Sequence, residues 1–126
     1  MDKVKFYKCN TCGNIIEMVD PSGVPVVCCG TPMQELIPNT VDASMEKHVP
    51  AVTVEGNTVS VKIGSVEHPM ASEHYIKFIV LETTKGVYRC NLKPGDAPNA
   101  VFTINNEKPL SVYEYCSIHG LWKADI

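Results

Sequence analysis

EGNTVSVKI, at residues 55–63, is the stretch that indicates the fold class. Val59, Val61 and Ile63 alternate with polar side chains, which is typical of a strand with one buried face. The Glu-Gly-Asn tripeptide directly before them fits a tight hairpin turn, and the β pattern begins on the other side of this turn, at about Ala51. This stretch therefore predicts an antiparallel hairpin that contributes one face to a hydrophobic core.

Further apolar runs follow the hairpin, and turn-forming residues separate them. The runs lie at residues 76–83, 87–92, 100–104 and 111–116, and the breaks contain Lys-Gly, Lys-Pro-Gly-Asp and Asn-Asn. Several short strands with such turns are typical of an antiparallel sandwich or barrel. No segment longer than one or two turns has helical periodicity, so the sequence predicts an all-β fold. Cys90 shares strand parity with Tyr88 and Leu92, which places it in the core as a small hydrophobe.

The six cysteines are unevenly distributed, which indicates a domain boundary. Four of them fall within residues 9–29, whereas Cys90 and Cys116 lie far downstream. Residues 1–37 contain only short apolar runs, and a unit below ~40 residues usually needs a metal, a disulfide or a partner chain to fold. We therefore predict two domains, residues 1–37 and residues 38–126, with Pro38-Asn39-Thr40 as a short linker.

Composition and charge argue against several classes of protein. The 126 residues are 44% hydrophobic, and no apolar run approaches the ~18 residues needed to cross a bilayer, so we expect no membrane span. The net charge is −3 and the basic residues are scattered, which argues against a nucleic-acid partner. The first residues show no apolar stretch of the kind found in a secretory signal, so we expect a cytoplasmic protein. In that reducing compartment the thiols are free for metals or redox chemistry.

Two cysteine pairs near the start of the chain predict a metal site. In CNTCG, at residues 9–13, the two-residue spacer lets the sulfurs of Cys9 and Cys12 turn toward one ion, and the glycine tolerates the bend. A redox pair of the thioredoxin kind would need a helix here, which the β-rich residues that follow do not supply. Cys28 and Cys29 complete a tetrahedral set for zinc or iron, a structural zinc ribbon being the alternative. Because neighbouring side chains of an extended chain point to opposite sides, this vicinal pair predicts a strained turn.

A second group of possible ligands lies after residue 38. It contains His48, His68, His74 and His119, together with Cys116, which forms a Cys-x-x-His pair with the last histidine. Each histidine taken singly is more often a surface or core residue than a ligand. Four imidazoles and one thiolate exceed what tetrahedral zinc takes, and they suit an iron that keeps a position open for substrate. Glu46 and Lys47 directly precede the first histidine, although a solvated charge pair is the alternative for these two.

The motifs in this order and spacing resemble those of desulfoferrodoxin, the two-iron form of superoxide reductase. After the Cys-x-x-Cys and vicinal Cys-Cys pairs come EKHVP at residues 46–50, GSVEHPM at 64–70, LKPGDAP at 92–98 and CSIHGLWK at 116–123. Each motif alone is a weak signal. Their combination is specific, and it covers essentially the whole chain.

The resemblance implies both the fold and the metals. It implies a small desulforedoxin-like or rubredoxin-like domain, followed by an immunoglobulin-like antiparallel β-sandwich, with two irons per chain. One iron would be bound by Cys9, Cys12, Cys28 and Cys29. The catalytic iron would be bound equatorially by His48, His68, His74 and His119 and axially by Cys116. The sixth position, opposite the thiolate, would be open to superoxide.

The resemblance also implies an activity, namely the one-electron reduction of superoxide to hydrogen peroxide, with electrons from rubredoxin or a similar donor, in a homodimer. Superoxide is an anion, so a chain of net charge −3 needs a local cation near the iron. The family pattern assigns that role, together with the holding of water for proton delivery, to Lys47. It assigns the open position of the oxidised iron to Glu46. We expect the thiolate of Cys116 to favour release of peroxide.

Three other interpretations stay open at the level of the sequence. The chain could be a non-catalytic electron carrier with two irons, or a zinc-stabilised interaction module. It could also be a superoxide dismutase, which would release oxygen without consuming a reductant. The four-cysteine centre could relay electrons, or it could hold the N-terminal domain and a dimer interface together.

Overall fold

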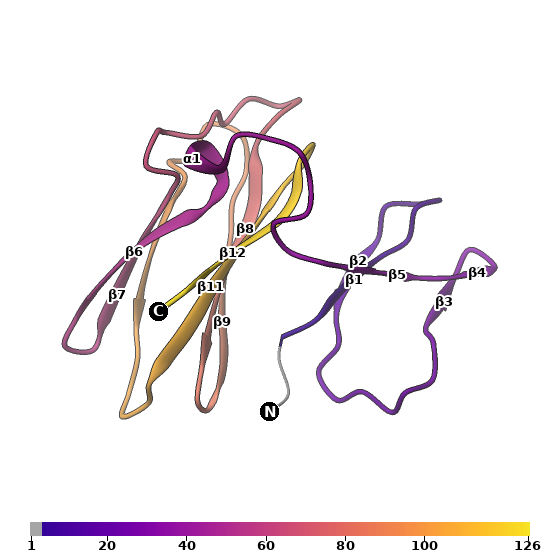
Figure 1. Cartoon of the computed structure of the whole chain (residues 1–126), viewed down its shortest axis with the longest axis horizontal. Coiled ribbons are helices and arrows are strands. Elements are labelled where there is room, and N and C mark those ends of the chain that lie inside the picture. The colour runs from indigo at the N-terminus through magenta and orange to yellow at the C-terminus, as the bar shows by residue number, and fades with distance from the viewer. Residues whose placement is uncertain (1–3) are drawn as a thin grey trace. The chain divides into compact units, whose positions relative to one another are not determined.

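The chain folds as two compact units that divide between Ile37 and Pro38 (Figure 1). The structure, a computed structural model, describes residues 4–126. Strands make up nearly all of its regular structure, and the helix α1, Met45–His48, is a single turn. In the part of the chain that the structure describes, no helix is long and apolar enough to cross a membrane. The predicted all-β class is confirmed.

The first unit has two small sheets and few buried side chains. Strand β1 (Phe6–Lys8) lies between β2 (Ile15–Glu17) and β5 (Gln34–Leu36), and β3 (Val27–Cys28) pairs with β4 (Thr31–Pro32). Among its described hydrophobic side chains, only Phe6, Cys9 and Met33 are buried. Such a small core supplies little free energy of folding, and a bound metal would supply the stability that this unit lacks.

The second unit is a sandwich of two antiparallel sheets. Its strands are β6 (Pro50–Glu55), β7 (Thr58–Ile63), β8 (Ile76–Thr83), β9 (Gly86–Asn91), β10 (Asn99–Thr103), β11 (Pro109–Cys116) and β12 (Gly120–Asp125). One sheet has the order β10-β7-β6 and the other the order β12-β11-β8-β9. Two antiparallel sheets packed face to face form the expected immunoglobulin-like sandwich.

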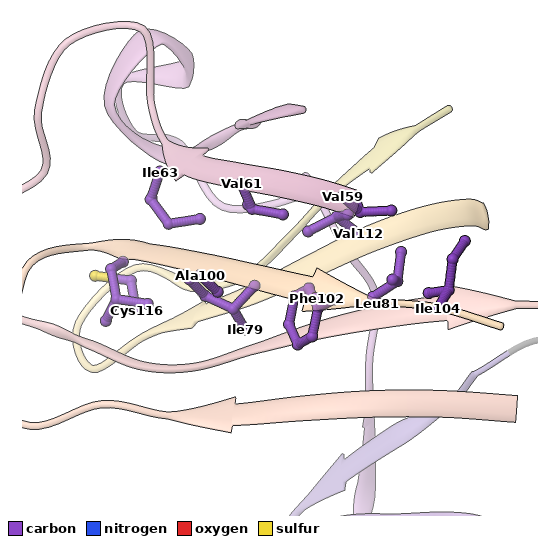
Figure 2. Packing of buried hydrophobic residues seen from close by; sticks show 11 residues of the cluster. Val59, Val61, Ile63, Ile79, Leu81, Ala100, Phe102, Ile104, Val112 and Cys116 are labelled. Atoms are coloured by element: carbon purple, nitrogen blue, oxygen red, sulfur yellow. The ribbon is translucent and has the colours of Figure 1, made fainter. Parts of the chain in front are cut away.

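The hydrophobic core lies between the two sheets, and the hairpin of residues 55–63 supplies one wall of it. Val59, Val61 and Ile63 are at most 3% exposed, and they point from β7 toward the facing sheet (Figure 2). Cys116 lies at one end of this core and is fully buried (Figure 2). Cys90 packs against the core while partly buried, which confirms its predicted structural role.

Strand β12 was not predicted from the sequence. It pairs with β11 along its full length, from Ser111 opposite Asp125 to Cys116 opposite Gly120. Leu121 and Trp122 are neighbours, yet both are buried, so the strand has apolar contacts on both faces at that point. This removes the alternation of polar and apolar residues by which a strand is recognised.

The predicted linker is attached to the second unit at Asn39. The backbone N–H of Asn39 donates to the carbonyl of Leu121 at 3.0 Å. Its side chain accepts a hydrogen bond from the backbone N–H of Lys123 at 2.9 Å and donates to the carbonyl of Lys123 at 3.2 Å. Asn39, in the middle of the predicted linker, therefore acts as an added strand residue on β12.

Glu107 joins three segments at the end of the sandwich where β8 ends and β11 begins. Its carboxylate accepts hydrogen bonds from the hydroxyls of Thr83 and Tyr88 and from the backbone N–H of Asn105. The Thr83 and Tyr88 hydroxyls and the Asn105 amide hold the pKa of Glu107 below its usual range. A lowered pKa contributes stability that is present above the pKa of the unfolded chain and is lost as pH falls through the folded value.

We therefore expect Glu107→Gln to lower the urea midpoint at pH 7 and to change it progressively less as pH falls below about 4.5. The glutamine amide nitrogen cannot accept a hydrogen bond, so one partner is lost at neutral pH. Urea denaturation of both proteins between pH 7 and pH 3 measures this difference. A difference that is constant with pH would contradict the assigned role of the ionised carboxylate.

Candidate metal centres

The first candidate centre is a group of four thiols in the N-terminal unit. The sulfurs of Cys9, Cys12, Cys28 and Cys29 all lie within 4.8 Å of one another. The Cys12 and Cys28 sulfurs are 3.6 Å apart, and the Cys28 and Cys29 sulfurs are 4.0 Å apart. Metal–sulfur bonds of about 2.3 Å in a tetrahedron place the sulfurs about 3.8 Å apart, so the group has the size of a four-thiolate site.

Two turns bring these thiols together. After β1, the N–H of Gly13 donates to the carbonyl of Cys9 at 2.8 Å, which closes the Cys-x-x-Cys turn. Between β3 and β4 the chain reverses at Cys29, whose φ is +53°. This left-handed conformation is uncommon for a residue other than glycine. The strained turn predicted for the vicinal pair is thus present, and it lets both sulfurs face the same point.

The electrostatics of the thiols also fit a cation. Backbone N–H groups of Cys12 and Thr11 lower the pKa of Cys9 to about 6. The neighbouring sulfur of Cys12 has the opposite effect on Cys29, raising its pKa to about 12. Four thiolates this close repel one another, and a divalent or trivalent metal is the species that would let all four ionise together.

The second candidate centre lies at the end of the sandwich where β8 begins and β11 ends. His48 ends α1, His68 and His74 lie in the segment between β7 and β8, Cys116 ends β11, and His119 lies in the turn before β12. Ligand atoms of His48, His68, His74 and Cys116 lie within 4.8 Å of one another. The Nδ1 atom of His119 joins them, 3.1 Å from Nε2 of His48 and 3.9 Å from the Cys116 sulfur.

Hydrogen bonds to backbone carbonyls determine which nitrogen of two rings faces the cluster. The Nδ1–H of His48 donates to the carbonyl of Ser44 at 2.6 Å, and that of His68 donates to the carbonyl of Pro69 at 2.7 Å. In a neutral imidazole the Nε2 atom then carries a lone pair. The two Nε2 atoms are nevertheless only 3.2 Å apart. Two lone pairs that face each other so closely repel, and a cation bound between them would remove this repulsion.

The other groups at this site fit a metal in the same way. The Nε2 atom of His74 is buried and has no hydrogen-bond partner among the described residues. Burial lowers the pKa of His48, His68 and His74, that of His68 to about 4, so these rings are neutral, as metal binding requires. Burial raises the pKa of the Cys116 thiol and so disfavours its ionised form. A bound metal would stabilise that thiolate. A set of nitrogens with one sulfur suits iron.

Two charged residues lie at the edge of the histidine cluster. Glu46 and Lys47 belong to α1, directly before His48, and both are exposed. Burial is the main cause of the lowered pKa of His48 and of His74. The positive charge of Lys47 makes a smaller contribution in the same direction. Lys47 therefore places a solvent-accessible cation beside the cluster, where its field acts on an approaching anion.

Trp122 contacts two of the candidate ligands, and we did not predict this role from the sequence. Its indole is 1% exposed and stacks on the ring of His48, with centroids 4.9 Å apart and an interplanar angle of 26°. Its Nε1–H donates to the carbonyl of His119 at 3.1 Å. One side chain thus orients two candidate ligands. The feature of the sequence that could have indicated this role is the single tryptophan, three residues after His119.

Glu114 is a second residue that we did not recognise from the sequence. It is fully buried, its two carboxylate oxygens have no partner among the described residues, and burial raises its pKa to about 9. It lies on the core side of β11, two residues before Cys116. The signal was a glutamate at an inward-facing position between Val112 and Cys116, where the alternation calls for an apolar side chain.

Comparison with known proteins agrees with this geometry. The family model described as desulfoferrodoxin matches residues 40–125, and the one described as desulfoferrodoxin, N-terminal domain, matches residues 1–36. A desulfoferrodoxin of Syntrophotalea carbinolica is 46% identical to this chain, and the match covers 98% of each of the two chains.

Two solved structures show the same fold. The crystal structure of the superoxide reductase from Treponema pallidum superposes with a TM-score of 0.82 at 36% identity, covering 98% of this chain and 99% of that one. The one-iron superoxide reductase from Giardia intestinalis matches 64% of this chain and 97% of its own length, with a TM-score of 0.57 at 32% identity. Since the two family models together match nearly every residue, the chain belongs to the desulfoferrodoxin family.

Proposed function

We propose that this chain is a superoxide reductase, an oxidoreductase that converts superoxide, one electron and two protons into hydrogen peroxide. The observation that carries this conclusion is the convergence of four imidazoles and one thiol at one end of the sandwich. Five such ligands exceed the needs of a structural zinc site, and they leave a position for a substrate. The superoxide reductases among the similar structures support the same activity.

The chain would hold two irons, one in each unit. Cys9, Cys12, Cys28 and Cys29 would bind the first, and His48, His68, His74, His119 and Cys116 the second. Iron at the second site would supply a one-electron redox couple. Residues 38–126 would form the catalytic domain, and residues 1–37 the domain of the four-cysteine centre. The Giardia match supports this division, because a one-iron enzyme covers only 64% of this chain.

Lys47 and Glu46 would act at the open side of the second site. Lys47 attracts superoxide through its exposed ammonium, whose field reaches His48 and His74. The same ammonium carries three hydrogen-bond donors and can hold the water that delivers protons. Glu46 would occupy the open position of the oxidised centre when no substrate is present. Buried Cys116 would supply the one thiolate of the second site, and its electron donation would favour release of the product peroxide.

The stoichiometry of turnover tests the function directly. With the two-iron protein, reduced rubredoxin and a calibrated flux of superoxide, we expect one peroxide per superoxide, one electron taken from the donor, and no oxygen from the reaction. Oxygen release without consumption of donor would identify a dismutase. Superoxide that persists while both centres cycle with the donor would identify an electron carrier, and a metal that does not change redox state would identify a zinc module.

The same proposal includes the electron donor, the cellular compartment and the oligomeric state of the protein. A rubredoxin-like donor fits a centre that takes one electron at a time, and six unpaired cysteines fit the reducing cytoplasm. The N-terminal unit exposes Val19, Val24 and Val27 to 89%, 71% and 61%, which gives it apolar surface to bury against a second copy. We therefore propose a homodimer. Sedimentation velocity of the two-iron protein tests it, and a monomer at micromolar concentration would contradict it.

A further inference from the structure

Gly64 lies directly against the backbone of the turn that carries Lys47. It is buried, it follows β7, and its φ is +79°. A Cβ added to Gly64 would overlap the carbonyl oxygen of Val66 and would lie 2.7 Å from the carbonyl oxygen of Glu46 and 2.8 Å from the carbonyl carbon of Lys47. All three neighbours are backbone atoms, which cannot rotate away as a flexible side chain can. This position therefore excludes every side chain.

The close approach lets residues 64–66 hold the turn through hydrogen bonds. The N–H of Val66 donates to the carbonyl of Glu46 at 3.0 Å, and the hydroxyl of Ser65 donates to the same carbonyl at 3.3 Å. The N–H of Gly64 itself donates to the carbonyl of Val49 at 3.3 Å. Three hydrogen bonds thus fix the backbone immediately before and after Lys47 and His48.

The turn depends on this external support because it is very short. Helix α1 has four residues, and its Ser44 N-cap makes no side-chain capping hydrogen bond. Its own backbone bonds run from the N–H of Lys47 to Ser44 and from the N–H of Val49 to Met45. A single helical turn is not stable by itself in water, because nucleation costs more than one hydrogen bond returns.

We propose that Gly64 is a positioning residue for superoxide capture: by lacking a side chain it lets residues 64–66 close on the α1 turn, and this contact holds Lys47 at the open side of the metal site. The inference rests on the proposed function, since it assigns Gly64 an effect through Lys47. His48 has an additional support outside the turn, namely the stacked indole of Trp122, so the exposed lysine is the part of the turn that depends most on Gly64.

The test is Gly64→Ala, with Gly56→Ala as the matched control. Gly56 has a φ of +60° and no atom within 4 Å of an added Cβ, so the control includes the backbone strain but not the collision. We expect Gly64→Ala to keep two irons per chain, to lower the rate constant for superoxide by about three- to tenfold, and to weaken its dependence on ionic strength. We expect Gly56→Ala to retain the native rate constant and salt dependence.

A double-mutant cycle shows whether Gly64 acts through Lys47. If it does, Gly64→Ala combined with Lys47→Ala is no slower than Lys47→Ala alone. Additive losses would overturn the proposal, as would loss of the second iron from Gly64→Ala, because either result would place the effect at the metal ligands. If Gly64→Ala does not fold, Ser65→Ala replaces it in the cycle, since it removes one hydrogen bond to Glu46 without a collision.

Hydrogen exchange separates this inference from the proposed function. In Gly64→Ala we expect faster amide exchange in residues 44–49, measured by mass spectrometry on the two-iron protein, and no such change in Gly56→Ala. If Lys47→Ala leaves the rate constant unchanged, the proposed role of Lys47 fails, and exchange alone then tests whether Gly64 holds the turn. Unchanged exchange in residues 44–49 would overturn the inference whatever the kinetics show.

Discussion

Replacing Lys47 with alanine is expected to lower the second-order rate constant for superoxide by about tenfold at low ionic strength. The chain has a net charge of −3, so its mean field repels the substrate. Lys47 is exposed at the edge of the histidine cluster, and its charge contributes to the lowered pKa of His48 and His74. Without this ammonium the approach of the anion is opposed rather than favoured.

Pulse radiolysis at increasing salt concentration measures the effect. In the native protein we expect the rate constant to fall as salt screens the attraction, since the Debye length shortens to ~10 Å at 0.1 M. In Lys47→Ala we expect this slope to flatten or to change sign. Lys85→Ala is the matched control, because it removes the same charge from the β8–β9 turn, at the other end of the sandwich. A rate constant for Lys47→Ala equal to that of Lys85→Ala would refute the steering role.

The fold was predictable where side chains alternate. In β7 one face meets the core and the other meets solvent, so Val59, Val61 and Ile63 carry a clear period of two. In β12 both Leu121 and Trp122 are buried, and the period disappears. Asn39 shows a second limit, because its side chain pairs with the backbone of β12, an interaction that no local pattern specifies. Sequence patterns thus report local amphipathicity and do not report contacts made on both faces or across distant segments.

The candidate ligands were predictable because ligand chemistry is specific. Thiols and imidazoles at these spacings have few other uses, and the structure brings together the two sets that the sequence predicted. The supporting residues were not predictable in the same way. Gly64 acts through the absence of a side chain, and Trp122 acts through packing, so neither carries a chemical signature of a metal site. Glu114 was visible only as a break in the pattern of β11.

Trp122 both fills the core and contacts two candidate ligands, so its replacement by leucine is expected to lower both the stability of the fold and the iron content of the second centre. The indole fills a buried position. Truncation of a buried tryptophan to alanine costs about 3–5 kcal/mol, and leucine fills only part of the cavity that the indole leaves. The change also removes the ring that stacks on His48 and the Nε1–H that binds the carbonyl of His119. We therefore expect Trp122→Leu to retain iron at the four-cysteine centre and to lose most of it from the second centre.

Iron content per chain, together with urea denaturation followed by circular dichroism, measures both effects. Phe102→Ala is the control for instability alone, because Phe102 is also buried in the core but packs against Tyr88, on β9, rather than on a ligand. We expect this control to unfold at a similarly reduced urea concentration while keeping both irons when folded. Trp122→Phe keeps a ring beside His48 without the Nε1–H, so its iron content measures the stacking contribution alone. If Trp122→Leu and Phe102→Ala lose equal amounts of iron from the second centre, then Trp122 stabilises only the fold and does not orient the ligands.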